Sequence, residues 1–261
     1  MVVGVLDSGV GGLSVLREIR RLLPGEHVLY VADSAYAPYG DRDPAFIDAR
    51  VGAIADFLVS RGAKAIVVAC NTATGVAVDG LRQRLALPVV AIEPAVKPAA
   101  LRTYTGRIGV LATSRTLASD RFRGLVTTHA SGVDVLEQAC PDLVERVEAG
   151  DVTSAGTRQL VEGYVAPLRE AGVDVLVLGC THFPFLEPLI RQAAGPGVTI
   201  VDPAAAVARQ LARRLDAGGL LTAGAGGDET FLTTGDPSRV APVIAHVWGR
   251  PVPVSHVQIG A

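Results

Sequence analysis

Short apolar runs rich in β-branched residues alternate with longer amphipathic stretches along most of this chain. Apolar residues in the longer stretches recur every three or four positions, which predicts helices. Strands that alternate with helices are joined by crossovers and so lie parallel, which predicts an α/β fold with mostly parallel sheets. The expected strands are residues 2–6, 27–33, 65–70, 88–94, 107–113, 133–140, 173–180 and 198–204. The expected helices are residues 13–23, 44–62, 76–85, 114–126, 152–172, 186–195 and 204–218.

The alternation restarts near residue 97. The segment EPAVKPAALRTYTG (93–106) carries prolines and loses periodicity, so we place a crossing between two α/β units there. The last expected helix returns the chain to the first unit, where the tail is expected to contain strands near 229–236 and 251–260. We predict two similar open sheets that face each other across an active-site cleft. The expected domains are residues 1–96 plus about 208–261, and residues 97–207.

The composition indicates a globular protein with a large core. The chain has 261 residues, of which 49% are hydrophobic and 19% charged, and its formal net charge of -2 favours neither nucleic acid nor an anionic membrane. The N-terminus, MVVGVLDSG, carries no secretory signal, and no apolar run approaches the roughly 20 residues that span a bilayer. Three cysteines are an odd count for a disulfide framework. We therefore expect a cytoplasmic protein with free thiols, no membrane partner and no direct nucleic-acid partner.

Polar residues follow three of the expected strands. In open parallel sheets, ligands bind beyond the carboxyl ends of the strands. A helix that begins there offers free backbone N–H groups, which suit a small anion and lower the pKa of a neighbouring thiol. If the two units face each other, the two cysteines flank one pocket. The three segments are Asp7-Ser8-Gly9, Cys70-Asn71-Thr72 and Cys180-Thr181-His182.

Each of these features also has an ordinary structural interpretation. The stretch DSGVGG resembles a dinucleotide fingerprint, but Ser14 occupies the place of its third glycine, so a tight strand-to-helix turn is the alternative. Asp7 could cap the following helix, and His182 could be a packing residue. A lone cysteine on a strand is usually a small buried hydrophobe, and we interpret Cys140, before Pro141, in that way.

A zinc site is a further alternative for the same side chains. Its ligands would be Asp7, Cys70, Cys180 and His182, which come from the ends of three strands far apart in the sequence. The chain has no short C-x-x-C or H-x-x-x-H pair, so the sequence favours acid–base chemistry over a metal.

Two opposed thiols suit the inversion of a stereocentre. One thiolate removes a proton from one face of a carbon, and the other thiol returns a proton to the opposite face. Amino-acid racemisation otherwise uses pyridoxal phosphate on a lysine. The only lysines are Lys64, which precedes an expected strand and should face solvent, and Lys97, which precedes Pro98. Neither suits a cofactor, so we expect chemistry that needs no cofactor.

Five segments carry a resemblance to a known family, and together they extend over nearly the whole chain. The sequence resembles the glutamate racemases of the cofactor-independent aspartate/glutamate racemase superfamily. Cys180-Thr181-His182 points to the glutamate branch, because the related aspartate racemases typically carry Glu where His182 stands. The segments are VLDSGVGGLSV (5–15), APYGDR (37–42), AIVVACNTA (65–73), IEP (92–94) and GCTHFP (179–184).

The resemblance implies interconversion of L- and D-glutamate, with D-glutamate supplied to peptidoglycan. It implies that Cys70 deprotonates D-glutamate with help from Asp7, and that Cys180 deprotonates L-glutamate with help from His182. Glu148, in VEAG, matches a further acidic residue near Cys180. Thr113 and Thr116 lie in a stretch that departs from the family's usual Gly-Thr pattern, so their contact with substrate stays open. The matching substrate-binding residues are Asp7, Ser8, Tyr39, Gly40, Asn71, Thr72, Thr181 and His182.

The resemblance also leaves alternatives. A racemase of another acidic amino acid, or another isomerase of the superfamily, would share the fold. A decarboxylase of the superfamily would use one thiol, whereas two are present here. A homodimer is expected. Some glutamate racemases also inhibit DNA gyrase, and nothing in this sequence indicates or excludes a gyrase partner.

Overall fold

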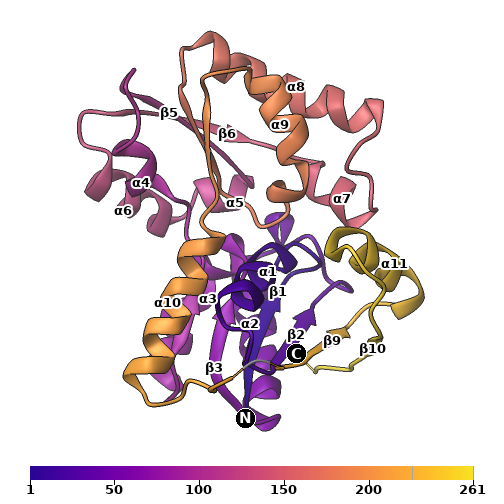
Figure 1. Cartoon of the computed structure of the whole chain (residues 1–261). Helices are drawn as coiled ribbons and strands as arrows, with labels where there is room; N and C mark the ends of the chain where they lie inside the picture. Colours follow the sequence, from indigo (N-terminus) through magenta and orange to yellow (C-terminus); the bar gives the residue numbers. More distant parts are fainter. Residues whose placement is uncertain (225, 261) are drawn as a thin grey trace.

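Two parallel sheets form the framework of the molecule (Figure 1). The computed structural model describes residues 1–224 and 226–260. The first sheet has the order β10 (Val254–His256), β9 (Glu229–Thr233), β2 (Val28–Ala32), β1 (Val2–Asp7), β3 (Ala63–Val68), β4 (Val89–Ala91). The second has the order β6 (Asp134–Ala139), β5 (Arg107–Ala112), β7 (Val175–Leu178), β8 (Thr199–Val201). Every pairing among these described strands is parallel, which confirms the predicted α/β class.

Helices cover both faces of the first sheet, so its central strands β1, β2 and β3 are buried on both sides. Alternate residues of β1 reach opposite cores, since Val3 and Val5 pack with α1 and α10 while Leu6 packs with α2 and α3. A strand buried on two faces is apolar at nearly every position, which explains why these strands are continuous hydrophobic runs in the sequence. The helices are α1 (Leu13–Leu22), α10 (Ala204–Ala217) and α11 (Pro237–Trp248) on one face, and α2 (Pro44–Ser60) and α3 (Asn71–Arg84) on the other.

The second sheet is covered in the same way. Val110 and Val177 pack toward α4 and α6, while Leu111 and Leu176 pack toward α8 and α9. The helices of this part of the chain are α4 (Val96–Ala100), α5 (Ser114–Leu117), α6 (Asp120–His129), α7 (Leu143–Glu148), α8 (Ala155–Glu170) and α9 (Glu187–Ala194).

Two 3-10 turns complete the helical elements, η1 (Tyr39–Asp41) and η2 (Phe183–Leu186). No helix among those in residues 1–224 and 226–260 is both long and apolar enough to span a bilayer.

Several elements differ from the sequence-based expectation. The helix expected over 114–126 is two helices, because the Ser119 side chain caps α6 by accepting from the backbone N–H of Phe122. The helix expected over 76–85 begins earlier, at Asn71. The short helices α4 and α7 and the proline-containing α11 were not expected, although β9 and β10 confirm strands in the tail. The limits of the two domains stay a prediction.

Lys64 corrects the expectation of a solvent-facing lysine. It lies inside β3, where its Nζ is 2.6 Å from Glu26 Oε2, and the two side chains are 3% and 1% exposed. Nζ also donates to the carbonyl of Leu220 and to Thr222 Oγ1. Burial would raise the pKa of Glu26, but the hydrogen bonds from Lys64 and Thr222 outweigh burial and lower it. The lysine is therefore half of a buried ion pair at the amino-terminal end of the first sheet.

Breaking this pair should destabilise the fold strongly. Lys64→Met leaves the Glu26 carboxylate buried without its cation, which should lower the free energy of unfolding by about 3–5 kcal/mol in urea titrations. Arg191→Met is the matched control, because the Arg191–Glu187 pair is 57% and 37% exposed and should contribute at most about 1 kcal/mol. Equal, small losses in the two variants would contradict the buried pair.

Candidate active site

The polar segments that follow β1, β3 and β7 meet between the carboxyl ends of the two sheets. A cavity of about 10 Å³ lies there, no larger than a water molecule needs. Both candidate cysteines line it, Cys70 from the first sheet and Cys180 from the second. Of the residues expected to bind substrate, seven line the cavity: Ser8, Tyr39, Gly40, Asn71, Thr72, Thr181 and His182. Pro38, Thr113 and Val144 complete the wall.

The glycine loop after β1 lets the second sheet approach the first. A Cβ atom at Gly9 would overlap the Glu148 carboxylate, and one at Gly11 would overlap the His182 ring. The expected tight turn is therefore also a place of close approach between the domains. The alternative that Asp7 caps the following helix is wrong, because α1 has Gly12 at its N-cap and no capping side chain.

His182 lies between a thiol and a carboxylate. Its Nδ1 is 3.7 Å from Cys180 Sγ, and its Nε2 is 2.6 Å from Glu148 Oε1. The backbone N–H of Val10 also donates to Glu148 Oε1, at 2.7 Å, which ties this group to the first domain. Burial would lower the pKa of His182, but its contacts with Cys180 and Glu148 outweigh burial and raise that pKa well above its usual range. The imidazole is thus held in its charged form.

Cys70 has a different environment. It is the N-cap of α3, and its Sγ accepts the backbone N–H of Ala73 at 3.5 Å and lies 3.9 Å from Ser8 Oγ. From the sequence, the helix was expected to lower the pKa of this thiol. That expectation is wrong for Cys70, because burial and then the Asp7 charge raise its pKa more than the N–H of Ala73 lowers it.

Asp7 is fully buried at the end of β1. Its carboxylate accepts the backbone N–H of Gly9 at 3.1 Å and the hydroxyl of Thr181, from the other domain, at 3.3 Å. Burial raises its pKa from 3.8 to about 6, against the attraction of His182 and the hydrogen bond from Gly9. Asp7 is therefore an acid that changes charge near neutral pH.

Hydroxyl and amide groups form the other side of the cavity. Thr72 Oγ1 lies 3.0 Å from Thr113 Oγ1 and 3.3 Å from Thr116 Oγ1, so α3 and α5 meet through three hydroxyls. Thr113 reaches the cavity wall, whereas Thr116 is buried behind it. Neither polar atom of the Asn71 side chain has a hydrogen-bond partner among the described residues, although both are buried. Such unpaired buried groups are rare and suit a ligand that would pair them.

Other candidate residues are less central. Cys140 is buried outside the cavity, and its thiol donates to the carbonyl of Gln138 at 3.4 Å. Among residues 1–224 and 226–260, no group of three or more His, Cys, Asp or Glu side chains is arranged to hold a metal ion. Asp33, which is fully buried near the site, was not among the predicted residues. The repeated Asp-Ser pair, residues 7–8 at the end of β1 and 33–34 after β2, is the signal that could have indicated it.

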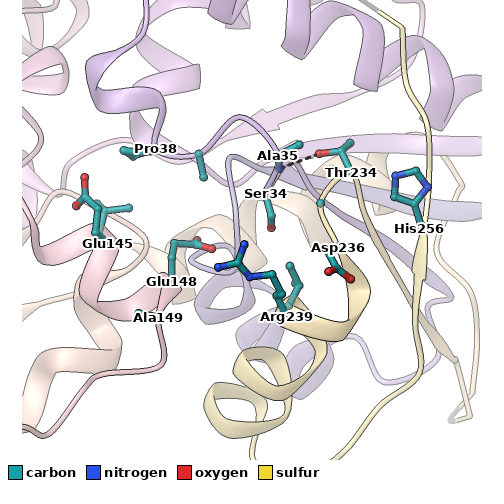
Figure 2. A pocket seen from close by; sticks show the side chains of 14 residues that line it. Ser34, Ala35, Pro38, Glu145, Glu148, Ala149, Thr234, Asp236, Arg239 and His256 are labelled. Carbon is teal, nitrogen blue, oxygen red and sulfur yellow. Dashed lines mark hydrogen bonds between the residues drawn. The ribbon is translucent and has the colours of Figure 1, made fainter.

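A larger and more open cavity lies beside the first (Figure 2). Its volume is about 830 Å³, and its wall includes Ser34, Glu148 and Arg239. Pro38 and Val144 belong to the walls of both cavities, so they separate this space from the two thiols. Glu148 lines this open cavity, and its Oε1 also contacts His182.

The chain belongs to the Asp/Glu/hydantoin racemase family, because the sequence model of that family matches residues 3–211. Among its relatives, the glutamate racemase of Pseudomonas aeruginosa is 50% identical over 258 residues, which cover 98% of this chain and 97% of the relative. The structure of glutamate racemase RacE1 from Bacillus anthracis is similar, with a TM-score of 0.89 and 35% identity over 98% of this chain and 97% of that one. Escherichia coli glutamate racemase, solved with L-glutamate and the activator UDP-MurNAc-ala, has a TM-score of 0.88 and 33% identity over 100% of both chains.

The raised pKa of Asp7 should appear in the pH dependence of stability. A folded-state pKa above the unfolded value contributes stability that is complete below about pH 4 and is lost as pH rises through about 6. A rise from 3.8 to about 6, at about 1.4 kcal/mol per pH unit, corresponds to about 3 kcal/mol. We therefore compare the native chain with Asp7→Asn by urea unfolding at pH 4 and at pH 7. The difference between their free energies of unfolding should change by about 3 kcal/mol between the two pH values.

Asp48→Asn removes an exposed carboxyl and is the control for the loss of one acidic group. The same Asp7→Asn difference at both pH values would mean that Asp7 does not titrate near pH 6.

Proposed function

We propose that this protein interconverts L- and D-glutamate by two-base proton transfer between Cys70 and Cys180. The observation that carries the proposal is that two buried thiols, one from each sheet, line a single small cavity. The relatives named glutamate racemase support the substrate, and the L-glutamate bound in the Escherichia coli structure supports it further. Two bases on opposite sides of one carbon can reach both of its faces, which a single base cannot.

The proposed reaction moves protons only. From L-glutamate, the Cys180 thiolate takes the α-proton, and the electron pair of the broken C–H bond stays on the substrate. The Cys70 thiol then gives its proton to the opposite face, which forms D-glutamate and leaves Cys70 as the thiolate. The reverse reaction exchanges the two roles. Nothing is oxidised or reduced, so the chemistry needs no redox cofactor.

The electrostatics of the site support different starting roles for the two thiols. Burial raises the pKa of Cys70, so it begins as the proton donor. His182, charged and 3.7 Å from Cys180 Sγ, holds a proton while Cys180 is the thiolate. Asp7, with a pKa of about 6, is mostly ionised at neutral pH and can assist Cys70 in the reverse direction.

The polar wall supports an amino-acid substrate. Helix α3 begins at Asn71, so its N-terminal end lies at the cavity wall that Asn71 and Thr72 form, and a helix N-terminus suits a carboxylate. The unpaired Asn71 amide offers both a donor and an acceptor. The cavity of about 10 Å³ is too small for glutamate, so substrate must bind to a more open arrangement that then closes.

The cellular role follows from the same chemistry. We propose that the D-glutamate made here supplies peptidoglycan synthesis, and that the enzyme acts in the cytoplasm, because all three cysteines are free. We expect a homodimer. Incubation of purified protein with L-glutamate, without added cofactor and with chiral detection of D-glutamate, tests the activity directly. Absence of D-glutamate would overturn the proposal.

Both thiols should be essential, and the third should not. Cys70→Ala and Cys180→Ala should each abolish turnover, because each removes one of the two bases, while Cys140→Ala should retain activity. Circular dichroism of L- and D-glutamate interconversion measures all three variants. Full racemisation by Cys70→Ala or Cys180→Ala would rule out the two-base mechanism.

His182→Asn should slow turnover of L-glutamate by about 100-fold, as is typical when a catalytic acid–base group is lost. Equilibrium requires kcat/KM to fall equally in the two directions, but the two kcat values can fall unequally. Such asymmetry would indicate that His182 serves Cys180 rather than Cys70. A folded variant, judged by thermal unfolding, that keeps the native kcat in both directions would leave His182 a packing residue.

A further inference from the structure

A buried ion pair lies just behind the catalytic cavity. Arg50, on α2, donates from Nη2 to Asp33 Oδ1 at 2.7 Å and from Nε to Asp33 Oδ2 at 3.1 Å. The two side chains are 1% and 0% exposed. A two-point contact of this kind fixes both the distance and the angle between the side chains. Asp33 follows β2, at the same edge of the sheet as Asp7 and Cys70.

This pair holds Tyr39, which lines the catalytic cavity. The phenol donates to Asp33 Oδ2 at 2.5 Å. Burial and then the charge of Asp33 raise the pKa of Tyr39, so the phenol keeps its proton and remains a donor. The Tyr39 hydroxyl therefore points back to the ion pair, while Tyr39 and Gly40 form the cavity wall. Gly40 packs against Thr113 of the other domain so closely that a Cβ would lie 3.3 Å from the threonine.

Two distant parts of the chain complete the arrangement. Thr234, after β9, donates to Asp33 Oδ1 at 2.8 Å and accepts the backbone N–H of Ala35 at 3.3 Å, the dashed contact in Figure 2. Near the C-terminus, the carbonyl of Ile259 accepts a hydrogen bond from Arg50 Nη1 at 2.8 Å. Each Asp33 oxygen therefore accepts two hydrogen bonds. Oδ1 accepts from Arg50 and Thr234, and Oδ2 accepts from Arg50 and Tyr39.

We propose that Asp33 and Arg50 are positioning residues of the racemase, which fix the Tyr39–Gly40 segment in the conformation that binds substrate. The proposal rests on the proposed function, because it concerns the same site. Neither side chain reaches the cavity, so both act through Tyr39. A wall segment held before substrate arrives loses less conformational freedom on binding, which favours a low KM.

The chain offers a matched control in the Lys64–Glu26 pair. It is equally buried and belongs to the same sheet, but it lies at the amino-terminal ends of the strands, away from the cavity. If both buried ion pairs served only stability, replacing the carboxylate of either pair by an amide of the same shape would have the same effect on KM and kcat. Glu26→Gln and Asp33→Asn therefore separate stability from positioning.

The experiment measures KM and kcat for L- and D-glutamate with the native enzyme, Asp33→Asn, Tyr39→Phe and Glu26→Gln. Loss of a hydrogen bond to a charged group should raise KM by about tenfold in Asp33→Asn and Tyr39→Phe, with kcat changed less than about threefold. Glu26→Gln should keep the native KM. Tyr39→Phe leaves the Asp33–Arg50 pair in place, so it reports on positioning even if Asp33→Asn does not fold.

Each outcome has one meaning. Native KM values in Tyr39→Phe and in a folded Asp33→Asn would overturn the positioning role. A lower kcat at unchanged KM, shared with Glu26→Gln, would also overturn it, because that pattern reports only loss of folded enzyme. A native protein that does not racemise glutamate would overturn the proposed function itself, and this result is seen before any variant is compared.

Discussion

The contact between the glycine loop and the Glu148–His182 pair is the constraint on which this site depends. Two separate sheets can share a cavity only if their strand ends come within side-chain reach, and side chains on the loop after β1 would prevent that. Gly9 and Gly11 leave the space that Glu148 and His182 occupy. The hydrogen bond from the Val10 N–H to Glu148 then joins the two domains at the point where they meet.

Burial gives the two halves of the site unlike electrostatics. In the first domain, burial raises the pKa of Asp7 and Cys70, which favours neutral forms. In the second, Glu148 and Cys180 surround a buried imidazole and favour its charged form. The two thiols have similar places in sequence but different partners, and the proposed two-base reaction begins with one of them as the thiol and the other as the thiolate.

The alternation of strands and helices predicted the fold class because parallel strands buried on both faces leave a strong apolar signal in the sequence. The rule that ligands bind beyond the carboxyl ends of parallel strands likewise predicted that Cys70, Cys180 and His182 lie in one region. Three features escaped, for physical reasons. Helix α11 contains Pro242, and a proline inside a segment argues against predicting a helix there. Lys64 can be buried because it pairs with Glu26, which lies 38 positions earlier in the sequence. The net effect of burial on the Cys70 pKa depends on packing that the sequence does not specify.

The closed cavity of about 10 Å³ has a consequence for successive turnovers under the proposed chemistry. After L-glutamate is converted to D-glutamate, Cys70 is the thiolate and Cys180 the thiol, which is the form suited to the opposite direction. Both cysteines are more than nine-tenths buried, so exchange of their protons with water is slow while the domains stay closed. Enzyme that has just released product would therefore start in the protonation state left by the last turnover, until both thiols exchange protons with water. If product leaves faster than the thiols exchange protons with water, that exchange, rather than the breaking of the C–H bond, limits the rate at high substrate concentration.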